Sequence, residues 1–204
     1  MQKTFEKELP EGYKQVYYLN AKDTKVGLIM NLVAFLVLGV VMGLAAIPLI
    51  VNQVNLWAIL MTGDPLLLLI MGVFFVAMIV YIILHELVHG AVYKAMTREK
   101  LSFGLSWSCA FCGVPEIYTY RKTALSSVVA PLIVFTVLLL PLTAWMYFVH
   151  PIAYLAAAFL FGMHLGGCSG DIYVAYLFLF KYKDSRVLMR DTGPEQYVFV
   201  PEKE

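Results

Sequence analysis

Residues 81–90 read YIILHELVHG, a HExxH motif inside an otherwise apolar stretch of the chain. Positions i and i+4 of a helix lie on one face, so the imidazoles of His85 and His89 can converge on one metal ion. Glu86 stands one residue on, where it can reach a metal-bound water without ligating the metal itself. Each ionisable group at the centre of a membrane helix costs about 2.5 to 3.5 kcal/mol on insertion scales. Three such groups within five residues therefore favour a functional site over a hydrogen-bonded core histidine.

The composition is typical of a membrane protein. Of the 204 residues, 61% are hydrophobic and only 14% are charged, whereas a soluble domain carries about 25% charged residues. All fifteen Lys and Arg residues fall in three blocks, at 3–25, 94–122 and 181–203. The two gaps between these blocks are each long enough for two passes of about 20 residues. The sequence therefore predicts four transmembrane helices, at about 26–51, 65–96, 123–149 and 151–180.

The placement of charge also predicts an orientation. By the positive-inside rule, both termini and the middle basic block are cytoplasmic, and the connections near 51–64 and near 150 face outward. Residues 1–25 are polar and lack an apolar core, so we expect no cleavable signal peptide and a first span that serves as an uncleaved anchor. Cys109, Cys112 and Cys168 lie in or near the cytoplasmic half, where a reducing compartment disfavours disulfides.

The pattern changes after the second span. Apolar residues at 101, 103, 105, 107 and 109 alternate with Ser and Gly, which predicts a half-buried strand. Residues 117–120 could form the return strand of a hairpin. That hairpin either presents an edge to an extended peptide, as in β-augmentation, or packs on the helix ends. Cys109-x-x-Cys112 is a weak metal signal without a second cysteine pair.

A third metal ligand must be found outside the motif, because a catalytic zinc usually has three protein ligands plus water. Outside the polar blocks the candidates are Asp64, His150, His164 and Asp171. Asp64 and His150 belong to the outer side in this topology, and we expect capping or loop roles for both. Asp64 in particular precedes Pro65, a pair that is typical of a helix start.

Depth in the membrane distinguishes the two remaining candidates. Counting back from the basic residue that follows the second span, at about 1.5 Å per residue, places His89 about 7.5 Å and His85 about 13.5 Å in. The same count on the fourth span places Asp171 about 15 Å and His164 about 25 Å in. Asp171 is therefore the preferred third ligand, beside glycines that allow close helix approach. His164 shares its helical face and stays as the alternative, or as a core histidine.

The motif at 85–90 together with Gly170-Asp171-Ile172 resembles the DUF3267 zincin peptidases. These are small multi-span prokaryotic membrane proteins, related in pattern to the site-2 protease class of intramembrane metalloproteases. The resemblance implies that His85, His89 and Asp171 bind zinc, that Glu86 is the catalytic carboxylate, and that the chain resides in a prokaryotic cell membrane. Site-2 proteases carry an Asn-Pro-x-x-Asp-Gly type motif, whereas no asparagine precedes the aspartate here.

The predicted fold class is an all-α membrane protein with about four transmembrane helices and a short cytoplasmic β-hairpin after the second span. We expect a cytoplasmic N-terminal segment at 1–25, a membrane-embedded metallopeptidase-like domain at 26–182 and a cytoplasmic tail at 183–204. The expected partners are the lipid bilayer and a peptide or membrane-protein substrate, with no nucleic acid.

The leading functional hypothesis is a zinc metallopeptidase of the HExxH type that hydrolyses peptide bonds within or beside a membrane segment. A non-catalytic metal-binding membrane protein that acts as a partner-binding scaffold is the alternative. Metal or proton transport is disfavoured, because no continuous chain of polar groups reaches the outer half.

Overall fold

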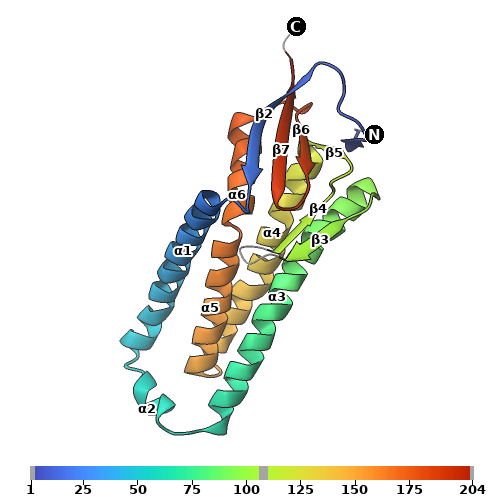
Figure 1. Ribbon diagram of the computed structural model, residues 1–204. Coiled ribbons are helices and arrows are strands. Elements are labelled where there is room, and N and C mark those ends of the chain that lie inside the picture. The colour runs from blue at the N-terminus through green and yellow to red at the C-terminus, as the bar shows by residue number, and fades with distance from the viewer. Residues whose placement is uncertain (1–2, 106–109, 203–204) are drawn as a thin grey trace. The chain divides into compact units, whose positions relative to one another are not determined.

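The computed structural model describes residues 3–105 and 110–202, and it divides into two compact units. Unit 1 comprises Met1–Met30, Ile83–Pro131 and Gly170–Glu204, and unit 2 comprises Asn31–Ile82 and Leu132–Ser169. The described chain is mostly helical (Figure 1). Within it, four segments are long and apolar enough to cross a membrane, namely α1 (Thr24–Val51), α3 (Pro65–Thr97), α4 (Arg121–Met146) and Pro151–Lys181. The four predicted apolar helices are therefore confirmed as helices.

Asp64 and His150 both cap helices, which is one of the two roles expected for them. Asp64 Oδ1 accepts the Leu66 N–H at 2.8 Å, just ahead of α3. His150 Nδ1 accepts the Ile152 N–H at 3.2 Å and so caps α5 (Pro151–Gly167). Such bonds satisfy donors that the first helical turn leaves unpaired. The short helix α2 (Leu56–Leu60) is capped in the same way by Asn55.

The predicted fourth span consists of three successive helical elements. Helix α5 ends at Gly167, α6 follows as Ser169–Tyr176, and the π-helical η1 continues as Leu177–Lys181. The junction between α5 and α6 falls at Cys168, between Gly167 and Gly170. Asp171 thereby comes to lie in the first turn of a helix.

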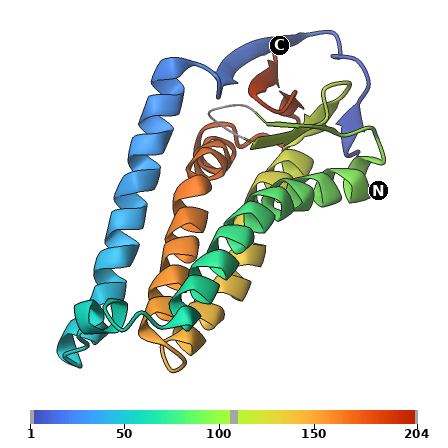
Figure 2. The same cartoon turned by 60° about the horizontal axis from the view of Figure 1, so that its bottom comes forward.

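In unit 2, α5 packs closely on α1 through glycine. Figures 1 and 2 both place α5 beside α1. A Cβ added at Gly166 would lie 2.7 Å from the carbonyl oxygen of Ala34, and one added at Gly162 would lie 2.7 Å from the Leu38 side chain. Small residues at this spacing let the backbones of membrane helices approach each other. This contact therefore requires glycine at Gly166.

We expect Gly166→Leu to destabilise unit 2, because the new side chain would meet the α1 backbone. Overpacking of this kind typically costs about 1–3 kcal/mol. The thermal unfolding temperature of the purified protein in detergent measures the effect. Gly43→Leu on α1 is the matched control, since a Cβ at Gly43 meets nothing within 4 Å. Equal unfolding temperatures for the two variants would contradict the packing described here.

Unit 1 contains a five-stranded antiparallel sheet with the strand order β1-β5-β6-β7-β2. Its strands are β1 (Phe5–Glu6), β2 (Tyr13–Asn20), β5 (Tyr118–Tyr120), β6 (Leu188–Asp191) and β7 (Glu195–Pro201). Figure 1 shows β2 beside β7, although they come from opposite ends of the chain. The all-α prediction is too narrow for this reason. Strand β7 lies in the segment expected as a cytoplasmic tail, and β2 lies in the segment expected as a polar N-terminal segment.

A separate two-stranded sheet follows α3, as the predicted hairpin does. Strand β3 (Ser102–Leu105) pairs antiparallel with β4 (Ala110–Gly113). The prediction that 117–120 is the return strand is wrong, because β5 pairs with β1 and β6 instead. The expected alternation through Trp107 and Cys109, and with it one half of Cys109-x-x-Cys112, lies outside the described residues.

One apolar core joins the five-stranded sheet to the helix segments of unit 1. Its fully or nearly fully buried members come from α3, α4, α6, η1 and the sheet region, and include Tyr93, Ala124, Val128, Val174, Phe178, Val114, Ile117, Met189 and Val198. This core holds the HExxH end of α3 and the start of α6 in one unit. The predicted domain boundaries at 25/26 and 182/183 stay predictions.

Candidate metal centre

The last turns of α3 present one buried face. His85, His89, Tyr93 and Thr97 follow one another at intervals of four residues, and all four are buried. Residues i and i+4 share a helix face, so the two imidazoles lie one turn apart, with ring centroids separated by 5.0 Å. Leu87, on another face, is 46% exposed. The spacing of the motif thus brings both histidines to one place.

Asp171 faces both imidazoles from the first turn of α6. Its Oδ2 lies 3.3 Å from His85 Nε2, and its Oδ1 lies 3.4 Å from His89 Nε2. A ligand atom from each of the three residues lies within 4.8 Å of the other two. A helix N-terminus favours a carboxylate, because the unpaired N–H groups there carry partial positive charge. The structure therefore brings together the three residues that are predicted to bind zinc.

The distances between these atoms suit a shared metal ion. Charge-assisted N–H···O bonds are about 2.7–2.9 Å long, and both contacts here are longer, at 3.3 and 3.4 Å. Tetrahedral ligands at about 2.0–2.1 Å from zinc lie about 3.3–3.4 Å from one another. Two imidazole nitrogens and one carboxylate also form a donor set used by catalytic zinc, with the fourth position open to water.

Ser127 on α4 sets the orientation of His89. His89 Nδ1 lies 2.9 Å from the Ser127 carbonyl oxygen, and a carbonyl only accepts, so Nδ1 donates its proton there. In the neutral ring, Nε2 then directs a lone pair at the Asp171 carboxylate, and two electron-rich atoms face each other unless a cation lies between them. A backbone carbonyl on the second ring nitrogen is a usual support for a metal-ligating histidine. Sequence patterns did not single out Ser127.

Glu86 lies next to the hairpin. The Glu86 carboxylate lies close to Cys112 in β4. On the following turn of α3, a Cβ added at Gly90 would lie 2.8 Å from the Phe103 ring of β3. The two-stranded sheet therefore lies close against the HExxH helix. Burial raises the pKa of the Cys112 thiol to about 12, so this cysteine is a neutral thiol in the metal-free chain.

His164 lies in unit 2 and is fully buried. Its Nδ1 lies 3.1 Å from the Tyr81 hydroxyl and 3.6 Å from Cys168 Sγ, and its Nε2 lies 3.1 Å from Thr136 Oγ1. Both ring nitrogens thus have hydrogen-bond partners within unit 2. This environment fits the interpretation of His164 as a hydrogen-bonded core histidine.

Asp191 belongs to the segment expected as a cytoplasmic tail. Its carboxylate is buried and lies close to the face of α3 that carries His85 and His89. Tyr93, one turn after His89, donates its hydroxyl to Asp191 Oδ2 at 2.7 Å, and the Gly193 N–H donates to Oδ1 at 2.9 Å. Burial raises the pKa of Asp191 to about 6, against the opposing effect of these hydrogen bonds. Asp191 is far from α3 and from the motif in the sequence, so its position beside them becomes evident only in the folded sheet.

The raised pKa of Asp191 predicts a pH-dependent stability. Its ordinary value is 3.8, so the folded chain holds this proton more tightly than the unfolded chain does. The free energy of unfolding therefore falls as the pH rises from about 4 to about 6, because the charge becomes buried only in the folded state. We expect the unfolding temperature of metal-free wild type, relative to Asp191→Asn, to fall over this interval. A difference that is independent of pH would contradict the assignment.

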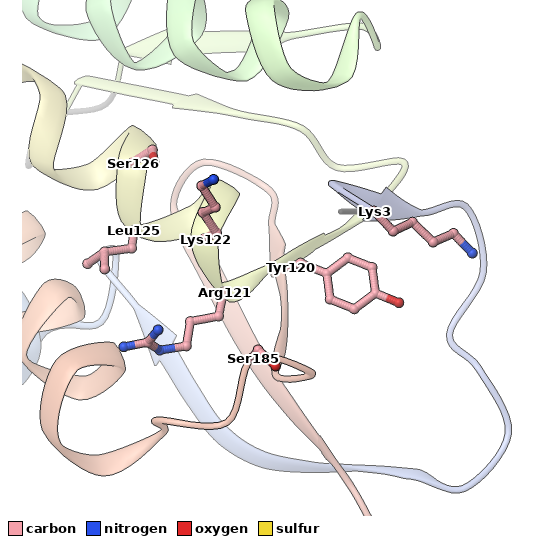
Figure 3. Close-up of a pocket in the computed structure, with 7 residues that line it drawn as sticks. All are labelled: Lys3, Tyr120, Arg121, Lys122, Leu125, Ser126 and Ser185. Carbon is pink, nitrogen blue, oxygen red and sulfur yellow. The ribbon is translucent and has the colours of Figure 1, made fainter. Parts of the chain in front are cut away.

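A cavity of about 240 Å³ in unit 1 lies apart from these ligands. It is lined by Lys3, Tyr120, Arg121, Lys122, Leu125, Ser126 and Ser185 (Figure 3). None of these lining residues is His, Cys, Asp or Glu, so the cavity is not the metal centre. Lys3 pairs with Glu6 at 2.7 Å. Figure 3 shows the Arg121 guanidinium and the Lys122 ammonium pointing in different directions, so they do not converge on one anion.

The fold and the motif place the chain in the class of mostly helical proteins that carry an HExxH sequence. The chain belongs to the DUF3267 family, described as "Putative zincin peptidase", whose model matches residues 78–186. The match covers just over half of the 204 residues and confirms the family resemblance. It includes the motif and Asp171, and it ends before Asp191. No curated protein and no solved structure matches the chain.

Proposed function

We propose that this chain is a membrane-embedded zinc metallopeptidase that hydrolyses peptide bonds within or beside a membrane segment. One observation carries the proposal: the Nε2 atoms of His85 and His89 meet the two oxygens of Asp171 at 3.3 and 3.4 Å, with Glu86 next in sequence to His85. Membership of a family described as a zincin peptidase supports the same chemistry.

The surface of the long helices supports the membrane part of the proposal. Large apolar side chains on α1, α3 and α4 are exposed, such as Phe35 at 70%, Leu68 at 78% and Val137 at 65%. Apolar surface on this scale needs a lipid or protein covering. With basic blocks before α1, after α3 and after η1, we place both termini and the metal centre on the cytoplasmic side of a prokaryotic cell membrane.

Each protein group has a defined task in hydrolysis. Zinc, when bound, supplies Lewis acidity that lowers the pKa of a water molecule from 15.7 to about 7. His85, His89 and Asp171 would hold the ion, and the Ser127 carbonyl fixes the His89 ring so that its Nε2 would be free to bind it. Glu86 accepts a proton from the attacking water while the oxygen of that water adds to the peptide carbonyl carbon. As the C–N bond breaks, Glu86 passes that proton to the leaving amine.

Strand β4 is the proposed guide for the substrate backbone. Cys112 of β4 lies close to Glu86, so an extended peptide that pairs with this strand would pass beside the proposed general base. Strand addition gives affinity through main-chain hydrogen bonds, with little demand on substrate sequence. The hairpin packs on α3 at Gly90 through Phe103, and binding of an extended peptide along β4 would be an additional role of the same element.

The proposal is tested by metal content and by new peptide termini. Purified wild-type protein is analysed for zinc by elemental mass spectrometry. Membranes from cells that express wild type or Glu86→Gln are compared for newly formed peptide termini by mass spectrometry. We expect one zinc per chain and a set of termini, within or next to apolar segments, that only wild type produces. Identical sets of termini would overturn the proposed peptidase activity.

A further inference from the structure

We infer that Tyr93 and Asp191 are positioning residues, whose buried hydrogen bond holds β4 in place against the HExxH end of α3. The effect of these two residues on catalysis rests on the proposed function, whereas their effect on the position of β4 does not. Asp191 lies beyond residue 186, where the family match ends. The support of the centre therefore extends into the tail of the chain.

Three hydrogen bonds from different elements converge on Asp191. The Tyr93 hydroxyl of α3 donates to Oδ2 at 2.7 Å, and the Gly193 N–H donates to Oδ1 at 2.9 Å. The Val114 N–H, directly after β4, donates to the Asp191 carbonyl oxygen at 2.8 Å. Tyr93 is 1% exposed, Asp191 3% and Val114 0%. One residue thus ties α3, the end of β4 and the turn between β6 and β7 together without solvent.

The backbone continues directly from this junction to Glu86. Gly113 packs its Cα against the backbone at Thr192 and Gly193, because an added Cβ would lie 2.7 Å from Thr192 C. The next residue back along the chain is Cys112, which lies close to the Glu86 carboxylate, in the hairpin that packs on α3 at Gly90. A shift at Asp191 therefore moves the strand that borders the general base.

The chemistry of the bond suits a fixed junction. A hydroxyl that donates to a carboxylate forms a short, charge-assisted hydrogen bond that is about twice as strong as a neutral one. Removing either partner leaves a buried polar group unsatisfied. In Asp191→Asn the amide has one acceptor oxygen, so the Tyr93 hydroxyl and the Gly193 N–H can no longer both donate to this side chain.

The first test compares three variants that each lose one buried hydrogen bond. They are Tyr93→Phe, Asp191→Asn and the control Thr119→Val. Thr119 is fully buried and donates to the Met189 carbonyl oxygen of β6 at 3.1 Å, without a bond to α3. Zinc content and kcat and KM per zinc-loaded molecule are measured with a synthetic peptide that spans the cleavage site found in membranes.

We expect all three variants to bind zinc as wild type does. Tyr93→Phe and Asp191→Asn should lower kcat about tenfold or more, in the range found for supporting groups of metal sites, with a smaller change in KM. The double variant should match the single ones, because the two residues share one bond. A merely structural role would lower the unfolding temperature in all three variants and leave kcat per bound zinc unchanged, which would overturn the inference.

The second test does not depend on activity. Amide hydrogen exchange at residues 110–114 is measured by mass spectrometry in the same variants, at matched zinc content. We expect faster exchange in Tyr93→Phe and Asp191→Asn, and wild-type exchange in Thr119→Val. Faster exchange in a chain that cleaves nothing would reject the proposed function and keep the positioning of β4. Unchanged exchange in both variants would reject the positioning role, whatever the activity.

Discussion

Glu86→Gln is expected to abolish detectable peptide cleavage while the purified protein keeps one zinc ion per chain. The amide has nearly the shape of the carboxylate, but it cannot accept a proton from water or return one to the leaving amine. General acid–base catalysis contributes roughly 10²–10⁴-fold to rate, so the loss should fall in that range or beyond. Zinc is measured by elemental mass spectrometry, and cleavage by the appearance of new peptide termini.

Glu116→Gln is the matched control for this result. Glu116 is exposed and lies between β4 and β5, so the same substitution should leave both zinc and cleavage unchanged. Cleavage that survives Glu86→Gln would reject Glu86 as the general base. The scaffold alternative makes the opposite prediction, since it requires the metal ligands but not Glu86.

His89→Ala and Asp171→Ala should each deplete the purified protein of zinc. Each substitution leaves two of three ligands, so zinc affinity should fall by more than the roughly 10–100-fold that follows loss of a supporting group. A titration with a zinc chelator, followed by metal analysis, measures this loss for each variant. Cleavage should disappear together with the metal.

Two further histidine substitutions make this measurement specific. His150→Ala removes an imidazole that caps α5 and should leave zinc in place. His164→Ala removes the alternative third ligand, and we expect it to retain zinc as well, with a lower unfolding temperature because its partners in unit 2 lose their bonds. Zinc that persists in Asp171→Ala and is lost in His164→Ala would reverse the assignment.

The parts of this molecule that were predictable depend on neighbours close in sequence. The i, i+4 spacing of His85 and His89 defines a helix face without any tertiary information. Asp64 and Pro65 mark a helix start through the first turn alone. The pairing of Asp171 with the motif needed one more assumption, equal depth of two helices, and the structure places the three side chains together within unit 1.

The features that were missed depend on contacts between distant segments. The apolar residues of β2 do not alternate regularly enough to predict a strand, and its partner β7 lies at the other end of the chain. In the sequence, Asp191 is one of several charged residues in the tail. Its role becomes visible only through its contacts with Tyr93 and Val114. Ser127 acts on His89 through its backbone carbonyl, a group that every residue has.

The pairing of β2 with β7 has a consequence for the order in which the protein is made. At a synthesis rate of about 5–20 residues per second, β2 leaves the ribosome roughly 10–35 s before β7 exists. All four apolar helices emerge during that interval, and β2 spends it without the strand beside which it finally lies. Asp191 joins Tyr93 only in the same last step, so in each newly made molecule this buried hydrogen bond forms after all four apolar helices have been made.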